Sequence, residues 1–490
     1  MGKQHTPDLR ELARNALIEV GFDPEFPAEV EQELTEIEHA GTHVAPDSVV
    51  RDMRDLLWSS IDNRESRDLD QVEYAERIAS GGYRLLVGIA DVDAFVPKGS
   101  AIDQHAAVNT VSVYTPAEVF PMLPLQLSTD LTSLVEGEDR LAVVMELSVT
   151  KDGDITSKQI SRAVVRNRAK MDYESVGAWL EGNAPAPEAM ARVRGIEEQV
   201  RLQDEIARAL HELRRRNGAL ELDRTELVPV IENGRVVRLD ERQHNRAQDI
   251  IESLMIAANT SMAELLESKG VPSLRRVVHT PERWPRIVET AAALGEHLPD
   301  VPDPRALSDF MSRRRAAAPE SYSELSLSIL KMLGPGDYLV EAPGLEQEGH
   351  FGLAVHDYTH STAPNRRFPD LVTQRCLKSV ASGSPAPYTR EELEAIAERC
   401  NKMESASRKV ERLMRKVAAA AMLSAHVGET FDAIVTGVTE KGTFARLKSP
   451  PADGRVVRGW QGLDVGDRVS VRLLSTDTKR GFIDFARIGR

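Results

Sequence analysis

The last 63 residues of the chain carry the pattern that most restricts the fold. Between residues 428 and 490, short runs that alternate apolar and polar residues, such as FDAIVTGV and RVSVRLL, are separated by glycine-rich turns. This alternation is typical of strands with one buried face. Five short strands in so short a length predict a small closed barrel of the OB type.

The preceding chain predicts a larger body in which strands come first and helices later. Residues 83–96 and 141–155 have strand patterns, and the second turns at Lys-Asp-Gly-Asp. Long helical patterns follow at about 187–216, 244–269 and 389–425. We therefore expect an α+β body over residues 46–425, followed by the barrel over residues 428–490.

The first 45 residues form a third region. Apolar positions recur at helical spacing in residues 8–20 and 27–39, with a break at Gly-Phe-Asp-Pro-Glu-Phe-Pro between them. This pattern predicts a short helical hairpin over residues 1–45, which is too little chain for a five-stranded barrel.

Charge is distributed unevenly along the chain. The formal net charge of -15 argues against a nucleic-acid partner, because phosphate binding relies on Lys and Arg. However, residues 1–50 contain 3 Lys or Arg and 11 Asp or Glu, net -8, whereas residues 428–490 contain 11 and 8, net +3. A basic cluster precedes the barrel, although it is equally typical of a solvated helix face: Arg408, Lys409, Arg412, Arg415 and Lys416.

The composition also indicates the cellular compartment of the protein. No run approaches the roughly 20 apolar residues of a membrane span, and the N-terminus lacks the apolar core of a signal peptide. The only cysteines, Cys376 and Cys400, lie in helical patterns and are too few for a disulfide framework or a zinc site. We expect a cytoplasmic protein that does not contact a membrane.

An acidic run is the first candidate site. Asp62, Asp68 and Asp70 lie within nine residues and follow neither helical nor strand periodicity. Such carboxylates can converge if the loop folds back, and they then repel one another unless a cation neutralises them. Hard oxygen ligands favour Mg²⁺, with Mn²⁺ as an alternative. An isolated Asp-x-Asp is more often a solvated turn, so this assignment needs support from elsewhere.

A second candidate site lies at residues 358–370. Arg366 and Arg367 follow a proline-containing turn and precede a helical pattern, where they could clamp a phosphate and stabilise charge developing on it. The structural alternative pairs Arg366 with a carboxylate such as Asp370.

Together these stretches resemble the ribonuclease II / ribonuclease R family and its catalytic RNB domain. The family's acidic element is Ile-Asp, five residues, then Asp-x-Asp-Asp, and its second element resembles Tyr-Thr-His-x-Thr-Ser-Pro-x-Arg-Arg-Tyr-x-Asp. The resemblance covers about residues 50–415, and the barrel looks like the family's S1-type RNA-binding domain. Further matches occur in the family's order at Tyr114 and Pro116, 121–124, Leu127 and Ser128, 140–142, Glu252, 255–259 and 350–353.

The resemblance implies an Mg²⁺-dependent, processive 3′-to-5′ exoribonuclease that converts single-stranded RNA with a free 3′ end to 5′-nucleoside monophosphates. Asp62, Asp68 and Asp70 would hold the metal, Arg366 would brace the phosphate, and Asp70 would be the carboxylate whose loss stops chemistry. Tyr114 and Tyr173 would stack near the 3′ end, although each could instead be a core tyrosine. Glu252 and Arg367 would also contact RNA, and no obligate protein partner is evident, so we expect a monomer.

The chain departs from the family pattern in two places. Gln71 replaces the fourth aspartate, which removes a negative charge but leaves an amide oxygen that can still ligate metal. This change motivates an alternative function, an RNA-binding regulator built on a weakened catalytic body. The acidic helical segment replaces the cold-shock-type barrels usual at the family's N-terminus, so we expect it to pack on the body or to leave the channel entrance open.

In the barrel, the S1-type resemblance assigns RNA contact to three residues, Lys441, Phe444 and Phe482. Phe431 is expected in the barrel core instead.

Overall fold

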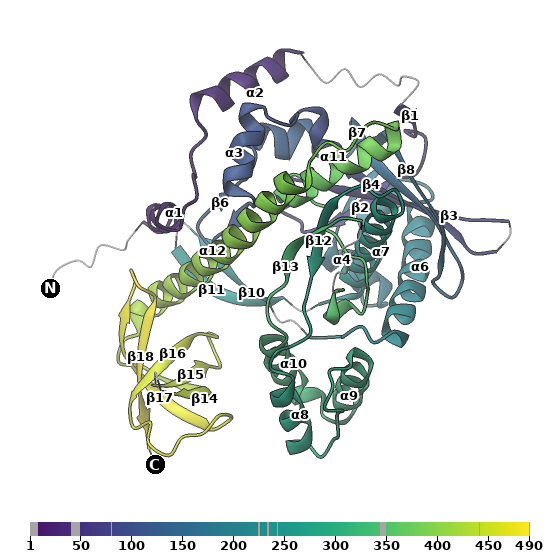
Figure 1. The fold of residues 1–490 in the computed structure, drawn as a ribbon. Helices are drawn as coiled ribbons and strands as arrows, with labels where there is room; N and C mark the ends of the chain where they lie inside the picture. Colours follow the sequence, from purple (N-terminus) through teal and green to yellow (C-terminus); the bar gives the residue numbers. More distant parts are fainter. Residues whose placement is uncertain are drawn as a thin grey trace.

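A computed structural model of the chain describes residues 8–40, 50–79, 81–223, 226–232, 235–242, 244–343, 349–440 and 442–489, with β10 (Glu226–Glu232) and β11 (Arg235–Arg242) described as backbone only. A mixed α+β body is joined to a C-terminal barrel by one long helix, α12 (Arg390–Leu423) (Figure 1). Two short helices, α1 (Leu9–Glu19) and α2 (Ala28–Ala40), precede the body. The predicted fold class is therefore confirmed.

The body is built on a seven-stranded sheet of order β1-β8-β7-β4-β3-β2-β9. The edge pairs β1–β8 and β2–β9 are parallel, and the other pairs are antiparallel. The predicted turn at residues 151–154 is confirmed, since it joins β7 to β8. The strand predicted over residues 83–96 is shorter, because a 3₁₀ turn at Val92–Ala94 follows Ala90. The strands are β1 (Val50–Asp52), β2 (Ser59–Asp62), β3 (Gln71–Arg77), β4 (Tyr83–Ala90), β7 (Asp139–Val149), β8 (Ile155–Arg166) and β9 (Ala169–Asp172).

Helices pack against this sheet and extend beyond it. The predicted helices over 244–269 and 389–425 are observed as α7 (Arg246–Ser268) and α12, and each begins with a capping box, at Asn245 and Thr389 respectively. The helix predicted over 187–216 is interrupted at Gly195, whose φ of +98° a helix cannot contain. It is therefore two helices, α5 (Glu188–Arg192) and α6 (Ile196–Arg216).

The remaining body elements flank the sheet. Helices α8 (Trp284–Ala293), α9 (Pro304–Ala317) and α10 (Pro319–Leu333) enclose a separate apolar cluster that includes Trp284, Phe310 and Tyr322. No helix among the described residues is both long and apolar enough to cross a bilayer. The other elements are α3 (Ala101–Asn109), β5 (Val113–Tyr114), β6 (Val119–Phe120), α4 (Tyr173–Leu180), β12 (Ser273–Val277), β13 (Asp337–Glu341) and α11 (Phe368–Ser382).

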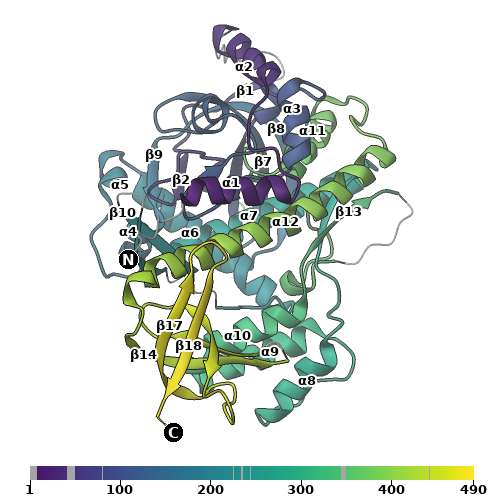
Figure 2. The ribbon, with the colours of Figure 1, turned by 90° about the vertical axis from the view of Figure 1, so that its left-hand side faces the viewer.

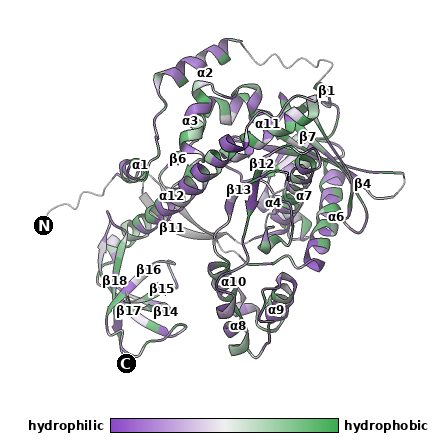
Figure 3. Cartoon of the chain, in the orientation of Figure 1, coloured by the Kyte–Doolittle hydropathy of each residue, from purple (hydrophilic) through white to green (hydrophobic). Residues whose placement is uncertain are grey.

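The C-terminal barrel is closed in the order β14-β15-β16-β18-β17. Its core includes Ala420 and Leu423 of α12, so the helix contributes to both the body and the barrel. Figure 3 shows hydrophobic and hydrophilic residues along α12, as its one buried face requires. Phe431 packs at the edge of the barrel core, as predicted. The strands are β14 (Thr430–Thr439), β15 (Gly442–Leu447), β16 (Asp453–Arg458), β17 (Arg468–Asp477) and β18 (Phe482–Ile488).

The predicted N-terminal hairpin is wrong, although both helices are present. Helix α1 packs against α12, and α2 packs against α3 (Figures 1 and 2). The buried faces explain this difference: Leu17 of α1 joins an apolar cluster with Met403 of α12, whereas Val30 and Leu34 of α2 join the core of the body. Each amphipathic face thus finds its partner in the body. The expectation that this segment packs on the body is confirmed.

Candidate active site

The two candidate stretches meet at Asp70. Asp62 ends β2 and Asp70 directly precedes β3, the neighbouring strand. From the turn before α11, the Asn365 backbone N–H donates to Asp70 Oδ1 at 3.1 Å, and Arg366 Nε lies 3.5 Å from Asp70 Oδ2. The half-exposed Arg366 side chain therefore sits over a buried carboxylate. The structural alternative, in which Arg366 pairs with a carboxylate, is observed with Asp70 rather than with Asp370, because Asp370 accepts from Arg367 at 2.7 Å.

Both buried aspartates have an oxygen without a donor. Asp70 is 2% exposed and Asp62 is 8% exposed, and Oδ2 of each has no hydrogen-bond partner among the described residues. Burial raises the pKa of Asp70 to about 7, although Arg366 acts in the opposite direction. Burial likewise raises the pKa of Asp62 to about 6. Carboxylate oxygens that are buried without donors are typical of a site that binds a positively charged ligand.

Asp68 lies at the edge of this site. It is half-buried, and its Oδ2 accepts a hydrogen bond from the Tyr114 hydroxyl at 3.3 Å. The loop that carries it is held by Lys170, whose Nζ donates to the carbonyls of Arg64 and Ser66. Within the described part of the chain, no three His, Cys, Asp or Glu side chains lie close enough together to surround a metal ion. The role of Asp62, Asp68 and Asp70 as joint metal ligands therefore stays a prediction.

Gln71 and Glu73 share one face of β3. Gln71 Nε2 donates to Asp62 Oδ1 at 3.0 Å, so in this arrangement Gln71 contacts the carboxylate through its amide nitrogen. Glu73 is fully buried, and neither of its carboxyl oxygens has a hydrogen-bond partner in the described structure. Burial, with a smaller contribution from Asp62, raises the pKa of Glu73 well above its usual range. The sequence analysis missed Glu73, although its spacing of two from Gln71 on a strand was a usable signal.

Two predicted aromatic residues flank the carboxylates. Tyr114 belongs to the short strand β5 and is 43% exposed, and burial of its hydroxyl raises its pKa to about 12. Tyr173 opens α4, directly after the strand β9 that pairs with β2. Burial raises the pKa of Tyr173, and the charge of Asp62 raises it further. Both tyrosines thus lie beside the acidic residues, and their stacking on RNA stays a prediction.

Other predicted residues lie outside this group. Arg367 faces Asp370, next to a buried group in which the Tyr338 hydroxyl and His360 Nδ1 are 2.8 Å apart. Glu252 is exposed on α7. Arg214, which the sequence analysis did not identify, donates to the Ser253 hydroxyl at 3.2 Å, and burial lowers its pKa even though Glu252 is nearby.

The barrel residues form a separate group. Phe482 is 57% exposed, Phe444 is half-buried opposite Arg455, and Lys441 lies outside the described residues. Phe482 follows Gly481, where an added Cβ would meet Lys416 Cβ of α12 at 2.6 Å. Phe482 therefore begins its strand beside the basic end of α12. Four exposed residues there pair with no described carboxylate: Lys409, Arg412, Arg415 and Lys416.

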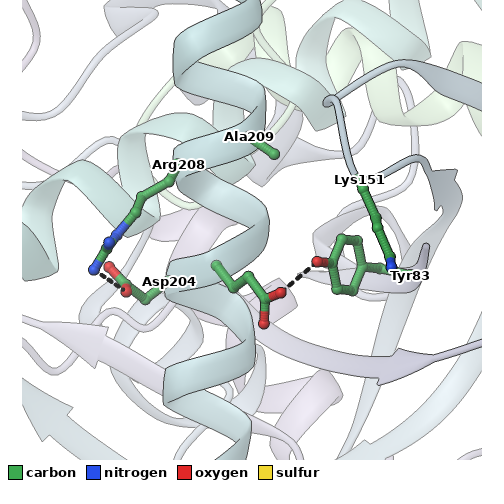
Figure 4. A pocket seen from close by; sticks show the side chains of 6 residues that line it. Tyr83, Lys151, Asp204, Arg208 and Ala209 are labelled. Atoms are coloured by element: carbon green, nitrogen blue, oxygen red, sulfur yellow. Dashed lines mark hydrogen bonds and ion pairs between the residues drawn. The ribbon is translucent and has the colours of Figure 1, made fainter. Parts of the chain in front are cut away.

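A surface pocket lies away from this site, and its acidic groups are already paired. It is lined by Tyr83, Lys151, Asp204, Glu205, Arg208 and Ala209 (Figure 4). Tyr83 pairs with Arg77 at the far end of β3 from Gln71, which is about 20 Å along a strand of this length. Its acidic groups are already satisfied, since Glu205 accepts from Tyr83 and Asp204 pairs with Arg208.

Comparisons with known proteins agree with this arrangement. Residues 50–383 match the RNB domain, and residues 429–488 match the RNase II-type exonuclease C-terminal S1 domain. The chain is 31% identical to Ribonuclease R 1 of Lactococcus lactis, over 87% of this chain and 52% of that protein. It is 30% identical to Ribonuclease R of Thermotoga maritima, over 95% of this chain and 68% of that protein. The chain thus spans about half to two thirds of the length of these relatives.

A solved structure shares the fold. The fold of Mycoplasma genitalium RNase R in complex with ribose methylated single-stranded RNA superimposes with a TM-score of 0.87 at 24% identity, over 98% of this chain and 78% of that one. The similarity extends across the body and the barrel, so the arrangement of the two is that of a known architecture.

The buried carboxylates predict an unusual pH dependence of stability. The pKa of Asp70 is about 7 in the folded protein and near 4 in the unfolded chain. The folded protein therefore binds the carboxyl proton of Asp70 more tightly than the unfolded chain does. The free energy of unfolding of metal-free protein should therefore fall as pH rises from about 4 to about 7. The Asp70→Asn variant should lose less of its free energy of unfolding over this pH range, and it should be more thermostable than wild type at pH 8. Melting curves in EDTA at pH 5 and pH 8 measure the difference, and identical pH dependence in both proteins would contradict the pKa assignment.

Proposed function

Because the chain belongs to the ribonuclease II / ribonuclease R family, characterised by the RNB domain, we propose that it is a 3′-to-5′ exoribonuclease. Its substrate is single-stranded RNA with a free 3′ end, which it hydrolyses processively to 5′-nucleoside monophosphates. The observation that carries this proposal is the pair of buried oxygens on Asp62 and Asp70 that have no hydrogen-bond donor in the described structure, with the Arg366 guanidinium 3.5 Å from the Asp70 oxygen. This combination can bind both a cation and a phosphate. The two buried thiols, Cys376 and Cys400, are compatible with a cytoplasmic location.

We further propose that Mg²⁺, or Mn²⁺ in its place, binds at these carboxylates. Asp62 and Asp70 fit this role, because each has a buried oxygen with no donor, and carboxylate oxygens are the ligands that these ions prefer. Asp68, at the edge of the site, and Gln71, which contacts Asp62 Oδ1, are the further proposed ligands. When bound, the ion would lower the pKa of a water molecule and neutralise charge on the phosphate.

The protein's own groups supply the remaining functions. Arg366 is half-exposed and held near Asp70, so its guanidinium can hydrogen-bond to a phosphate and stabilise the charge that develops during hydrolysis. Tyr114 and Tyr173 offer flat rings at the site, which can stack on any base without reading sequence. Glu252, Arg367 and the barrel residues Lys441, Phe444 and Phe482 would contact RNA farther from the site of cleavage.

The alternative function is an RNA-binding regulator with a weakened catalytic body, which Gln71 motivates. A single experiment separates the two. A 5′-labelled, single-stranded RNA of about 30 nucleotides is incubated with the protein and Mg²⁺, with EDTA as the control. Shortening from the 3′ end that depends on Mg²⁺ supports the enzyme, whereas an intact RNA with retarded mobility supports the regulator.

Asp70→Asn should abolish hydrolysis and leave RNA affinity within a few-fold of wild type. The substitution removes a charge needed for cation binding, while the amide oxygen can still accept from the Asn365 N–H. Turnover is measured with the labelled RNA, and binding is measured by electrophoretic mobility shift. Substantial turnover by this variant would exclude Asp70 from the proposed cation site.

Arg366→Lys should lower kcat by at least about 100-fold, because an ammonium group cannot form the planar, bidentate contact that a guanidinium makes with phosphate. The effect should fall on kcat if this contact strengthens in the transition state. Steady-state kinetics provide kcat, single-turnover kinetics provide the rate constant of the chemical step, and fluorescence anisotropy provides Kd. An unchanged kcat with weaker binding would assign Arg366 to ground-state RNA binding instead.

Gln71→Asp should lower the Mg²⁺ concentration that gives half-maximal activity, because another negative charge strengthens attraction for the cation. Gln71→Asn is the matched control, since it has the same side-chain length as Asp and no charge. Both substitutions lose the present contact with Asp62, so the difference between them isolates the charge. Equal Mg²⁺ midpoints for the two variants would mean that residue 71 lies outside the metal's coordination shell.

A further inference from the structure

The N-terminal segment reaches the candidate active site through an apolar cluster. Leu17 of α1 and Phe22, just after it, are buried together with Met403 and Val410 of α12. The same cluster contains Val113 of β5, the residue directly before Tyr114. Figure 2 shows α1 lying along α12 on this side of the body. The strand that presents Tyr114 is therefore packed partly against the N-terminal segment.

Hydrogen bonds fix the linker after α1 to the end of α3. The Asn109 side chain accepts from the Asp23 backbone N–H at 2.9 Å and donates to the Asp23 carbonyl at 2.7 Å. Arg399 of α12 donates to the carbonyls of Gly21 and Val108, at 3.2 and 2.9 Å respectively. Asn109 is 4% exposed, so its two contacts with Asp23 are partly shielded from water, whereas the Arg399 contacts are exposed. The linker thus pairs with the side chain of the last residue of α3, and Arg399 joins the linker to the same helix end through the Val108 carbonyl.

The chain that follows Asn109 runs beside the catalytic arginine. Thr110 carries a φ of +62°, which β-branched residues rarely adopt, and this bend directs the chain toward β5. The Thr110 carbonyl accepts from the Phe368 N–H at 2.8 Å, and the Ser112 N–H donates to the Arg366 carbonyl at 3.0 Å. One short segment therefore supports the backbone of Arg366 on one side and leads directly into Tyr114 on the other.

We infer that the N-terminal segment positions Tyr114 and Arg366 for catalysis. In this role Phe22 is a positioning residue, which acts through Val113 and the Asn109–Tyr114 segment rather than by touching RNA. A loss of packing at Phe22 would release the side of β5 that faces away from the carboxylates. The Tyr114 hydroxyl would then lose its fixed distance to Asp68. This inference rests on the proposed exoribonuclease function. The part of the substrate that Tyr114 and Arg366 would contact is the 3′-terminal nucleotide.

A double-mutant cycle tests the inference in the full chain. Phe22→Ala should lower kcat on the labelled RNA by about tenfold with Kd little changed, because small displacements of reacting groups are costly. In a Tyr114→Ala background the same substitution should lower kcat by clearly less than tenfold, since one of its two targets is already absent and only the support of Arg366 remains to be lost. Phe22→Leu should restore most of kcat. The matched control is Leu34→Ala on α2, which is equally buried but packs on α3, and it should lower the melting temperature without lowering kcat.

Hydrogen exchange provides a measurement that does not need activity. Phe22→Ala should accelerate exchange at the amides of Ser112 and Phe368, whereas Leu34→Ala should not. If Phe22→Ala accelerates exchange at these amides but the wild-type protein hydrolyses no RNA, the proposed function is contradicted while the structural contact between Phe22 and the Asn109–Tyr114 segment is supported. Equal losses of kcat from Phe22→Ala with and without Tyr114, or unchanged exchange at Ser112 and Phe368, would overturn the inference and reduce the segment to a stabilising role.

Discussion

The candidate active site depends on one contact between distant parts of the chain, the hydrogen bond from the Asn365 N–H to Asp70 Oδ1, across 295 residues. Both partners are fixed independently. The Asp70 carbonyl accepts from Ala90 on β4, and the Asn365 side chain accepts from the Thr132 hydroxyl at 2.6 Å. Because Asp70 is nearly inaccessible to water, this protein donor is essential to its position. The same turn then projects Arg366 over the carboxylate, so a single backbone contact brings the acidic side chain of Asp70 and the basic side chain of Arg366 together.

Buried carboxylates in this protein differ in how fully their oxygens are hydrogen-bonded. Asp91 is fully buried but satisfied, since Arg162 and Lys378 each approach it to 2.8 Å. Asp62, Asp70 and Glu73 are as deeply buried, yet each retains at least one oxygen without a donor in the described structure. An unpaired buried carboxylate destabilises a fold unless a ligand compensates for it. The fold is therefore least stable at the place where a cation would bind, which is the usual cost of a preorganised site.

The parts that the sequence predicted are those whose chemistry is local. The acidic run and the Arg366–Arg367 pair could be recognised because each lies within a dozen residues, and the long helices because their periodicity and caps are continuous. The helix break at Gly195 and the turn after Ala90 are local errors of prediction, and the other errors are tertiary. The sequences of α1 and α2 do not indicate that their apolar faces pack on α12 and α3 rather than on each other. The choice of Arg367 as the partner of Asp370 depends on the turn geometry at residue 363, whose N–H also donates to Asp370. Glu73 was missed because an acidic residue on a strand is ordinarily exposed.

Charge placement reconciles the acidity of the chain with the proposed RNA substrate. Acidic residues dominate α2, and α1 carries two arginines and two glutamates, whereas the exposed basic residues of α12 without described carboxylate partners lie along the helix up to Lys416, which meets the barrel at Gly481. Electrostatic attraction between exposed charges decays within about 10 Å at moderate salt, so a polyanion responds to the nearest surface rather than to the net charge. The exposed Phe482 ring stands at the same junction, beside Lys416. Under the proposed function, RNA would therefore meet phosphate-binding and base-stacking groups where the barrel joins α12, in addition to those at the acidic site.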